Sequence, residues 1–157
     1  MKNSAAIEKL IVFKIADYFL ALPLTSVLKV INYPPANNGD IKAPGIIQIG
    51  RHAITLWDLH QILADSDRPQ TIQIRPFLLI AQVLPGELCA IPVEEPPNLV
   101  ELPKHSLRTL PQSFHHHQLR YLVSYVAVLS EAEKTFTIFL VDLNRVLSLL
   151  SNRSLRG

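Results

Sequence analysis

A chain of 157 residues with a net charge of +2 has room for one domain, or two closely joined halves, around a real hydrophobic core. Its 15 basic and 13 acidic residues are too balanced for a nucleic-acid-binding protein, and no apolar run approaches the roughly 20 residues that span a bilayer. We therefore expect no nucleic acid and no direct membrane insertion. The N-terminus lacks a basic segment followed by an apolar stretch, which favours a cytoplasmic protein.

Short apolar strands dominate the pattern along the chain. Apolar runs bounded by turn residues predict strands at 10–15, 18–22, 46–49, 53–57, 77–83, 88–93, 99–102, 121–129 and 135–141. After Pro23, apolar residues at i, i+3, i+4 and i+7 predict a helix over 24–31. Two more helices are expected from Asp58 and Asp142, and residues 103–118 look irregular. Strands this closely linked favour small barrels or a sandwich over a doubly wound fold.

The most informative feature is an internal repeat. The segment Trp57-Asp58-Leu59-His60-Gln61-Ile62-Leu63 returns as Val141-Asp142-Leu143-Asn144-Arg145-Val146-Leu147, and Leu20-Ala21-Leu22-Pro23-Leu24 resembles Cys89-Ala90-Ile91-Pro92-Val93. In each copy an apolar strand leads to an Asp that is placed to accept from backbone N–H groups at a helix start. We expect one domain over 1–157, with halves at about 8–65 and 75–150 and a polar connector at 64–76.

Groups that carry catalysis do not gather in the sequence. There is no G-x-S-x-G turn, no Cys/His signature and no Gly-rich phosphate loop. Asp58 and Asp142 suit acid–base work in principle, but helix capping already accounts for both. Cys89 lies in an apolar strand pattern, which predicts a small core residue. We expect no enzyme, no cofactor and no bound metal.

Histidines provide the main alternative. His105 lies near His115, His116 and His117 in the sequence, so a metal-dependent enzyme or a metal sensor stays open as an interpretation. Consecutive residues of an extended chain point in alternate directions, which makes three convergent ligands difficult. Tetrahedral zinc sites also prefer Cys or carboxylate partners at helical or hairpin spacing. A solvated loop is the expectation for these residues.

The order of motifs resembles the CheW-like coupling domain of bacterial chemosensory systems over about residues 8–150. The motifs are Ile11-Val12-Phe13-Lys14-Ile15 with Leu20-Ala21-Leu22-Pro23, Gly45-Ile46-Ile47-Gln48-Ile49-Gly50-Arg51 with Leu56-Trp57-Asp58-Leu59, Leu88-Cys89-Ala90-Ile91-Pro92-Val93-Glu94, and Phe139-Leu140-Val141-Asp142-Leu143. The resemblance implies a mainly β fold of two small five-stranded SH3-like β-barrels packed side by side, with short capping helices. It also implies a non-enzymatic adaptor in chemotaxis or motility signalling.

The family's partners are the cytoplasmic tip of a chemoreceptor and the regulatory domain of a CheA-type histidine kinase. In the family, a groove between the halves accepts the receptor tip, and the predicted helix with Val27 and Val30 borders it. The expected partner-binding residues are Val27, Val30, Ile46, Gln48, Ile49, Gly50 and Arg51. Independently of the family, a glycine between two short strands permits a turn with positive φ that projects Arg51 outward.

The chain departs from the family pattern at several positions. The family's Asn-Leu-Arg-Gly motif stands as Gln48-Ile49-Gly50-Arg51, and Lys29 replaces a glutamate, so the family's usual acid–base pair cannot form. Ser124 replaces a family glycine and Thr55 a family proline. Because the apolar pattern is intact, these changes bear on partner choice rather than on the fold. A stand-alone regulatory domain that competes with a coupling protein is a further alternative.

Overall fold

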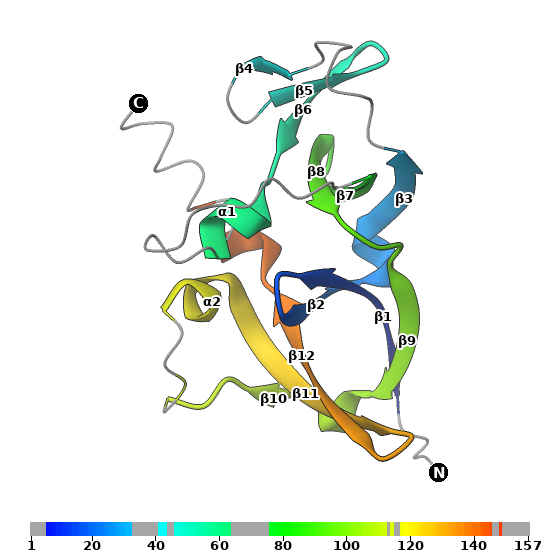
Figure 1. Ribbon diagram of the computed structural model, residues 1–157, viewed down its shortest axis with the longest axis vertical. Coiled ribbons are helices and arrows are strands. Elements are labelled where there is room, and N and C mark those ends of the chain that lie inside the picture. Colours follow the sequence, from blue (N-terminus) through cyan, green and yellow to red (C-terminus); the bar gives the residue numbers. More distant parts are fainter. Residues whose placement is uncertain are drawn as a thin grey trace.

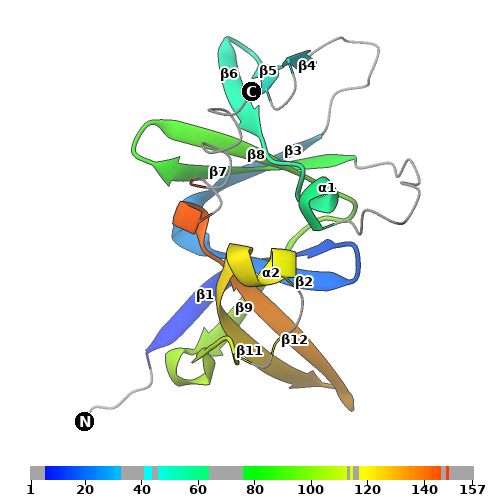
Figure 2. The ribbon, with the colours of Figure 1, turned by 90° about the vertical axis from the view of Figure 1, so that its left-hand side faces the viewer.

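The computed structural model describes residues 6–32, 41–43, 46–63, 76–112, 114, 117–145 and 148, and it folds them into two six-stranded sheets (Figure 1). The first sheet, called barrel A below, contains β1 (Ile7–Ile15), β2 (Tyr18–Pro23), β9 (Asn98–Pro103), β10 (Arg108–Thr109), β11 (Val123–Glu131) and β12 (Lys134–Val141). The second, barrel B, contains β3 (Val27–Asn32), β4 (Ile41–Ala43), β5 (Ile46–Ile49), β6 (His52–Leu56), β7 (Phe77–Leu84) and β8 (Glu87–Val93). Barrel B lies above barrel A in both ribbon views (Figure 2).

Short helical segments connect these strands. They are the 3-10 turns η1 (Leu24–Ser26) and η3 (Lys104–Ser106) and the α-helices α1 (Leu59–Leu63) and α2 (His117–Leu122). Residues 143–145 are helical as well. None of these helices forms a layer of its own, so the described part of the chain is mainly β, as predicted.

The two edge strands of each sheet are consecutive in the chain. In barrel A the strand order is β10-β11-β12-β2-β1-β9, so the two edge strands are β9 and β10, which follow one another in the chain and are joined through η3. In barrel B the order is β3-β7-β8-β6-β5-β4, and its edges β3 and β4 are also consecutive; residues 33–40 between them lie outside the described part. Counting β9, η3 and β10 as one segment gives barrel A the predicted five strands. The predicted fold class is confirmed.

The two halves of the chain exchange their first hairpins. Hairpin β1–β2 joins barrel A through parallel pairing of β2 with β12, where Leu20 lies opposite Phe139. Hairpin β7–β8 joins barrel B through parallel pairing of β8 with β6, where Cys89 lies opposite Thr55. The repeat makes Leu20 equivalent to Cys89 and Phe139 equivalent to Thr55. The two repeated sequence segments therefore pair in the same register in both barrels, so the sequence repeat corresponds to a structural repeat.

The two repeated aspartates cap helical turns as predicted. Asp58 Oδ1 accepts a hydrogen bond from the backbone N–H of Gln61 at 3.2 Å. Asp142 Oδ1 accepts from the backbone N–H groups of Asn144 at 3.1 Å and Arg145 at 3.3 Å. Each carboxylate thus satisfies donors that a helix start leaves unpaired.

Three apolar clusters hold the fold together. Barrel A encloses Leu10, Val12, Ala21, Leu102, Ala127 and Ile138. Barrel B encloses Ile47, Ile54, Leu78, Ile80 and Ala90. A larger cluster, the inter-barrel core, joins side chains of both sheets and both helices, among them Phe13, Leu22, Trp57, Leu79, Ile91 and Leu122. The exchanged hairpins are therefore buried on both faces, which explains why their sequences are nearly continuous apolar runs.

Two predicted elements are wrong. The segment 24–31 is not a helix: η1 leads into β3, an edge strand with a β-bulge between Val27 and Lys29. That bulge shifts the alternation of the strand and imitates a helical spacing. Conversely, α2 occupies a stretch expected to be irregular and delays the start of β11 to Val123. The connector residues 64–75 and most of the predicted final helix beyond residue 145 lie outside the described residues.

Candidate partner-binding surface

The described α-helices cover the inter-barrel core from one side. The helices α1 and α2 bury Ile62, Leu63, Leu119 and Leu122 against it. Figure 1 shows these helices on the left and the edge strands β3 and β9 on the right. Between those edges lies η1, which contacts both β1 and β7. On the right-hand side the core is thus bordered by two sheet edges and a single 3-10 turn.

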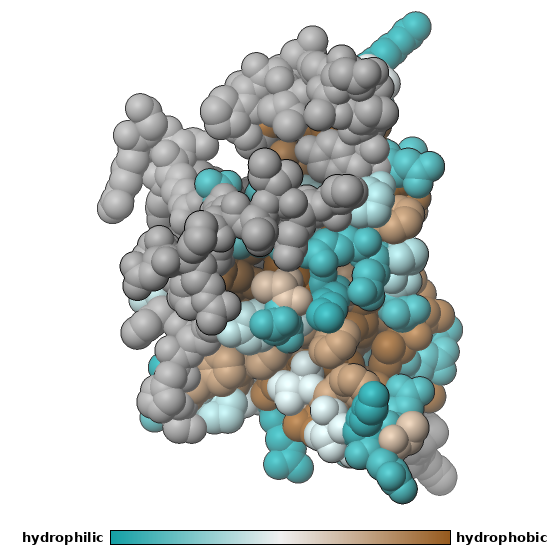
Figure 3. All heavy atoms as spheres, viewed as in Figure 1, coloured by the Kyte–Doolittle hydropathy of each residue, from teal (hydrophilic) through white to brown (hydrophobic). Residues whose placement is uncertain are grey.

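Apolar side chains are exposed along that open side. Val30 pairs with Leu79, and Leu99 pairs with Ile11; both partners belong to or pack against the inter-barrel core. Directly paired residues point to the same face of a sheet. Val30 and Leu99 therefore extend the core to the surface, where they are 40% and 54% exposed. Figure 3 shows apolar side chains at the surface along the side where β3 and β9 lie.

We call Leu24, Val27, Val30 and Leu99 the open rim. Val27 is half-buried against the inter-barrel core, while Leu24 on η1 is exposed. Two predicted site residues, Val27 and Val30, thus lie on the open rim. Leu24 and Leu99 were missed, because an apolar residue at the edge of a two-sided core has the same sequence pattern as one inside it.

The other predicted site residues form the hairpin of β5 and β6. Ile49 pairs with His52 and leaves Gly50 and Arg51 as a two-residue turn, with Gly50 at φ +60°. The Gln48 side chain donates to the Gly50 carbonyl at 3.2 Å, which ties strand and turn together. Arg51 is exposed, as predicted from the glycine before it. In the same strand Ile46 is exposed and Ile49 packs against the core of barrel B.

The structure does not bring the two sets of predicted residues into one patch. Three strands, β7, β8 and β6, separate β3 from β5 in the sheet. Val27 and Val30 therefore belong to the open rim, whereas Ile46, Gln48, Ile49, Gly50 and Arg51 belong to the hairpin of β5 and β6. Lys29 and Arg51 are both exposed, and neither forms an ion pair with any described residue.

A buried polar contact links the two halves of the chain. His60 on α1 and Glu94 after β8 approach within 2.9 Å through Nε2 and Oε1, although they lie 34 positions apart. His60 is almost fully buried, whereas Glu94 is about one-third exposed. A single His–Glu pair provides neither a nucleophile nor a metal site, so we assign it to holding α1 against the junction of the barrels. Sequence analysis did not predict this contact.

Metal-binding residues do not converge in the described part of the chain. No group of three or more His, Cys, Asp or Glu residues there is placed to hold a metal ion. His105 lies exposed on η3. His115 and His116 fall outside the described residues, and the structure does not describe the side chain of His117.

Cys89 is a core residue, as predicted. Its side chain is fully buried in the inter-barrel core. Burial raises the pKa of the thiol to about 12, although a hydrogen bond with the backbone of Ala81 opposes that shift. A thiol of this kind stays protonated and unreactive at neutral pH.

Comparisons with known proteins give a family match and a similar fold. A family model described as CheW-like domain matches residues 9–151. The scaffolding protein TtCheW from Thermoanaerobacter tengcongensis has a similar crystal structure, with a TM-score of 0.62, 18% sequence identity and coverage of 87% of this chain and 90% of TtCheW. No curated protein matches the sequence. Among the described residues, no helix has the length and apolar character required to cross a membrane.

Proposed function

Because the chain belongs to the CheW-like domain family, we propose that it is a cytoplasmic adaptor that couples chemoreceptors to a CheA-type histidine kinase in chemotaxis or motility signalling. The observation that carries this proposal is the family match over residues 9–151 together with the two-barrel fold. The family is one of scaffolding proteins and is not catalytic. The chain works by binding partners.

The open rim is the proposed site for the receptor tip. Its exposed apolar residues border the inter-barrel core on a side that none of the described helices covers. An amphipathic helix binds such a groove by laying residues at i, i+3, i+4 and i+7 into it. The exposed Lys29 beside Val30 favours a helix with an acidic residue near its apolar stripe.

The β5–β6 hairpin is the proposed site for the kinase regulatory domain. Ile46 supplies an exposed apolar contact, and Gln48 holds the turn that presents Arg51. In the family pattern, a glutamate at the position of Lys29 pairs with the arginine of the hairpin motif. In this chain both Lys29 and Arg51 are basic, so the proposed partner provides the acidic residue that each of them pairs with. The proposed consequence of the reversed Arg-Gly order is a change in kinase choice.

Val30→Asp tests the receptor site, with Val128→Asp as its matched control. Val128 is an exposed β-strand valine, 61% accessible, on barrel A away from the open rim. We expect Val30→Asp to weaken binding of a purified receptor cytoplasmic fragment by at least about tenfold, because a buried interface cannot accept an unpaired carboxylate. Val128→Asp leaves that affinity unchanged. Equal affinities for both variants contradict the receptor site.

Arg51→Glu tests the kinase site in the same preparation. We expect about tenfold weaker binding of the kinase regulatory domain, with binding to the receptor fragment unchanged. In a reconstituted receptor–kinase array, a coupling protein raises kinase activity, whereas a competing regulatory domain lowers it. Lowered activity, or failure of the wild-type chain to bind either partner, counts against the adaptor function.

A further inference from the structure

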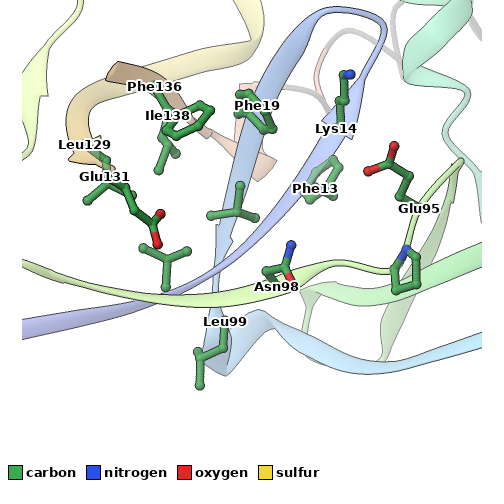
Figure 4. A pocket seen from close by; sticks show the side chains of 13 residues that line it. Phe13, Lys14, Phe19, Glu95, Asn98, Leu99, Leu129, Glu131, Phe136 and Ile138 are labelled. Atoms are coloured by element: carbon green, nitrogen blue, oxygen red, sulfur yellow. The ribbon is translucent and has the colours of Figure 1, made fainter. Parts of the chain in front are cut away.

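A cavity of about 460 Å³ opens at the mouth of barrel A; of the open-rim residues, Leu99 borders it (Figure 4). Its apolar lining includes Val12, Phe13, Phe19, Leu129, Phe136 and Ile138. Phe19 and Phe136 meet edge to face, with ring centroids 5.5 Å apart. This volume falls within the range of small-molecule sites, and the rings of Phe19 and Phe136 provide faces that attract cations.

The polar lining of this cavity carries a net negative charge. It consists of Glu95, Glu131, Lys14 and Asn98. Within the described residues, neither glutamate forms an ion pair, and Lys14 forms none either. Figure 4 shows Glu131 at the same end as Phe136 and Ile138, while Lys14 lies toward the other end with Glu95. An unpaired carboxylate beside aromatic rings is thus available at the Glu131 end.

The equivalent position in barrel B lacks these features, although the repeat makes the two barrels comparable. There Leu88 stands for Phe19 and His52 for Phe136, and the hairpin ends in the two-residue turn Gly50-Arg51. In barrel A the hairpin is longer by the pairs Ser130–Thr135 and Glu131–Lys134. This extension is what carries Glu131 to the mouth. The acidic, aromatic cavity is therefore a property of barrel A and not of the repeated fold.

We propose that the mouth of barrel A binds a hydrophobic organic cation, an amine whose ammonium group pairs with Glu131 and whose hydrocarbon body lies against Phe19 and Phe136. A carboxylate together with aromatic rings favours a cation over a neutral molecule of the same shape. Binding of an anion is disfavoured, because the carboxylates of Glu131 and Glu95 repel it. The proposal does not depend on receptor or kinase binding.

The test compares three probes of one shape against the full chain: 3-phenylpropylammonium, 3-phenylpropan-1-ol and 3-phenylpropionate. Binding is followed by NMR titration of backbone amide resonances. For ligands of this size we expect a dissociation constant of about 1 mM, with the ammonium binding about fivefold tighter than the alcohol. The largest shifts are expected in β2, β11 and β12.

Two variants and one matched control test whether Glu131 and Phe136 cause the preference for the ammonium probe. Glu131→Gln removes the preference for the ammonium over the alcohol, whereas Glu133→Gln, on the same hairpin but outside the cavity lining, retains it. Phe136→Leu keeps the apolar volume but weakens ammonium binding by about threefold through loss of the ring. The proposal is overturned if the alcohol or the carboxylate binds as tightly as the ammonium, if Glu131→Gln binds the ammonium like the wild type, or if no probe binds.

Discussion

The Asp142 cap permits a quantitative test of the repeat. Replacing Asp142 by alanine removes the acceptor of two backbone N–H groups, those of Asn144 and Arg145, and the ion pair of Arg145 Nε with Asp142 Oδ2 at 3.5 Å. Each hydrogen bond contributes about 0.5–1.5 kcal/mol net. Because the Arg145 side chain is half-exposed, the ion pair adds only a few tenths of a kcal/mol. Together with the known range for caps, this gives a loss of about 1–2 kcal/mol.

The assay is equilibrium urea unfolding, supported by thermal melting. For a domain of this size a loss of that magnitude lowers Tm by about 3–6 °C. Asp142→Asn keeps a side-chain acceptor but loses the charge, so we expect less than half of the loss. Asp58→Ala removes the equivalent cap in the first half, where Asp58 Oδ1 accepts from the backbone N–H of Gln61 at 3.2 Å, and we expect it to lower stability as well.

Two results would refute this reasoning. One is a change below about 0.3 kcal/mol for Asp142→Ala, which means that water replaces the carboxylate at no cost. The other is an equal loss for Asp142→Asn and Asp142→Ala, which means that the charge and not the hydrogen bonds carries the effect.

Three further predictions address the exchanged hairpins, the thiol and the open rim. Fragments 1–69 and 70–157 are expected to remain unfolded alone and to form a folded complex when mixed, since each barrel takes strands from both halves; a folded single fragment, judged by circular dichroism, contradicts the exchange. Cys89 is expected to remain unmodified by 5,5′-dithiobis(2-nitrobenzoate) at pH 8 until the protein unfolds. Burial raises the pKa of its thiol from 9.0 to about 12, so the contribution of the protonated thiol to stability is intact below pH 9 and is lost toward pH 12. Leu99→Ser is expected to lower stability by less than about 1 kcal/mol in urea unfolding, because this side chain is more than half exposed; a core-sized loss rules out its place on the rim.

Local sequence patterns predicted both caps and every strand except β3, β4 and β10, because these features depend on neighbouring residues. Alternation and turn residues located the hairpins, and an Asp after an apolar strand located α1. The segment 24–31 failed for a physical reason: its bulged edge strand places Val27 and Val30 toward one core and Ile31 toward another, so its spacing resembles a helix. Periodicity alone cannot separate these cases.

The pairing of distant strands was not predictable from local pattern. The runs that form β2 and β8 are apolar on both faces, so either fits either barrel, and only the tertiary fold selects the partner. The contact of His60 with Glu94 was missed for the same reason. Of the predicted site residues, Gly50 and Arg51 depend on a local turn that the sequence signals, whereas the open rim depends on two edges that only the fold brings together.

The exchange of hairpins has a consequence for the nascent chain. Hairpin β1–β2 is synthesised before the other strands of this domain, and its neighbours β9 and β12 are made long afterwards. During translation both apolar faces of this hairpin are therefore exposed to water while the strands of barrel B are still being made. Such late, long-range closure slows folding and leaves time for aggregation, so this fold calls for a chaperone that shields its oldest segment until the last strand emerges.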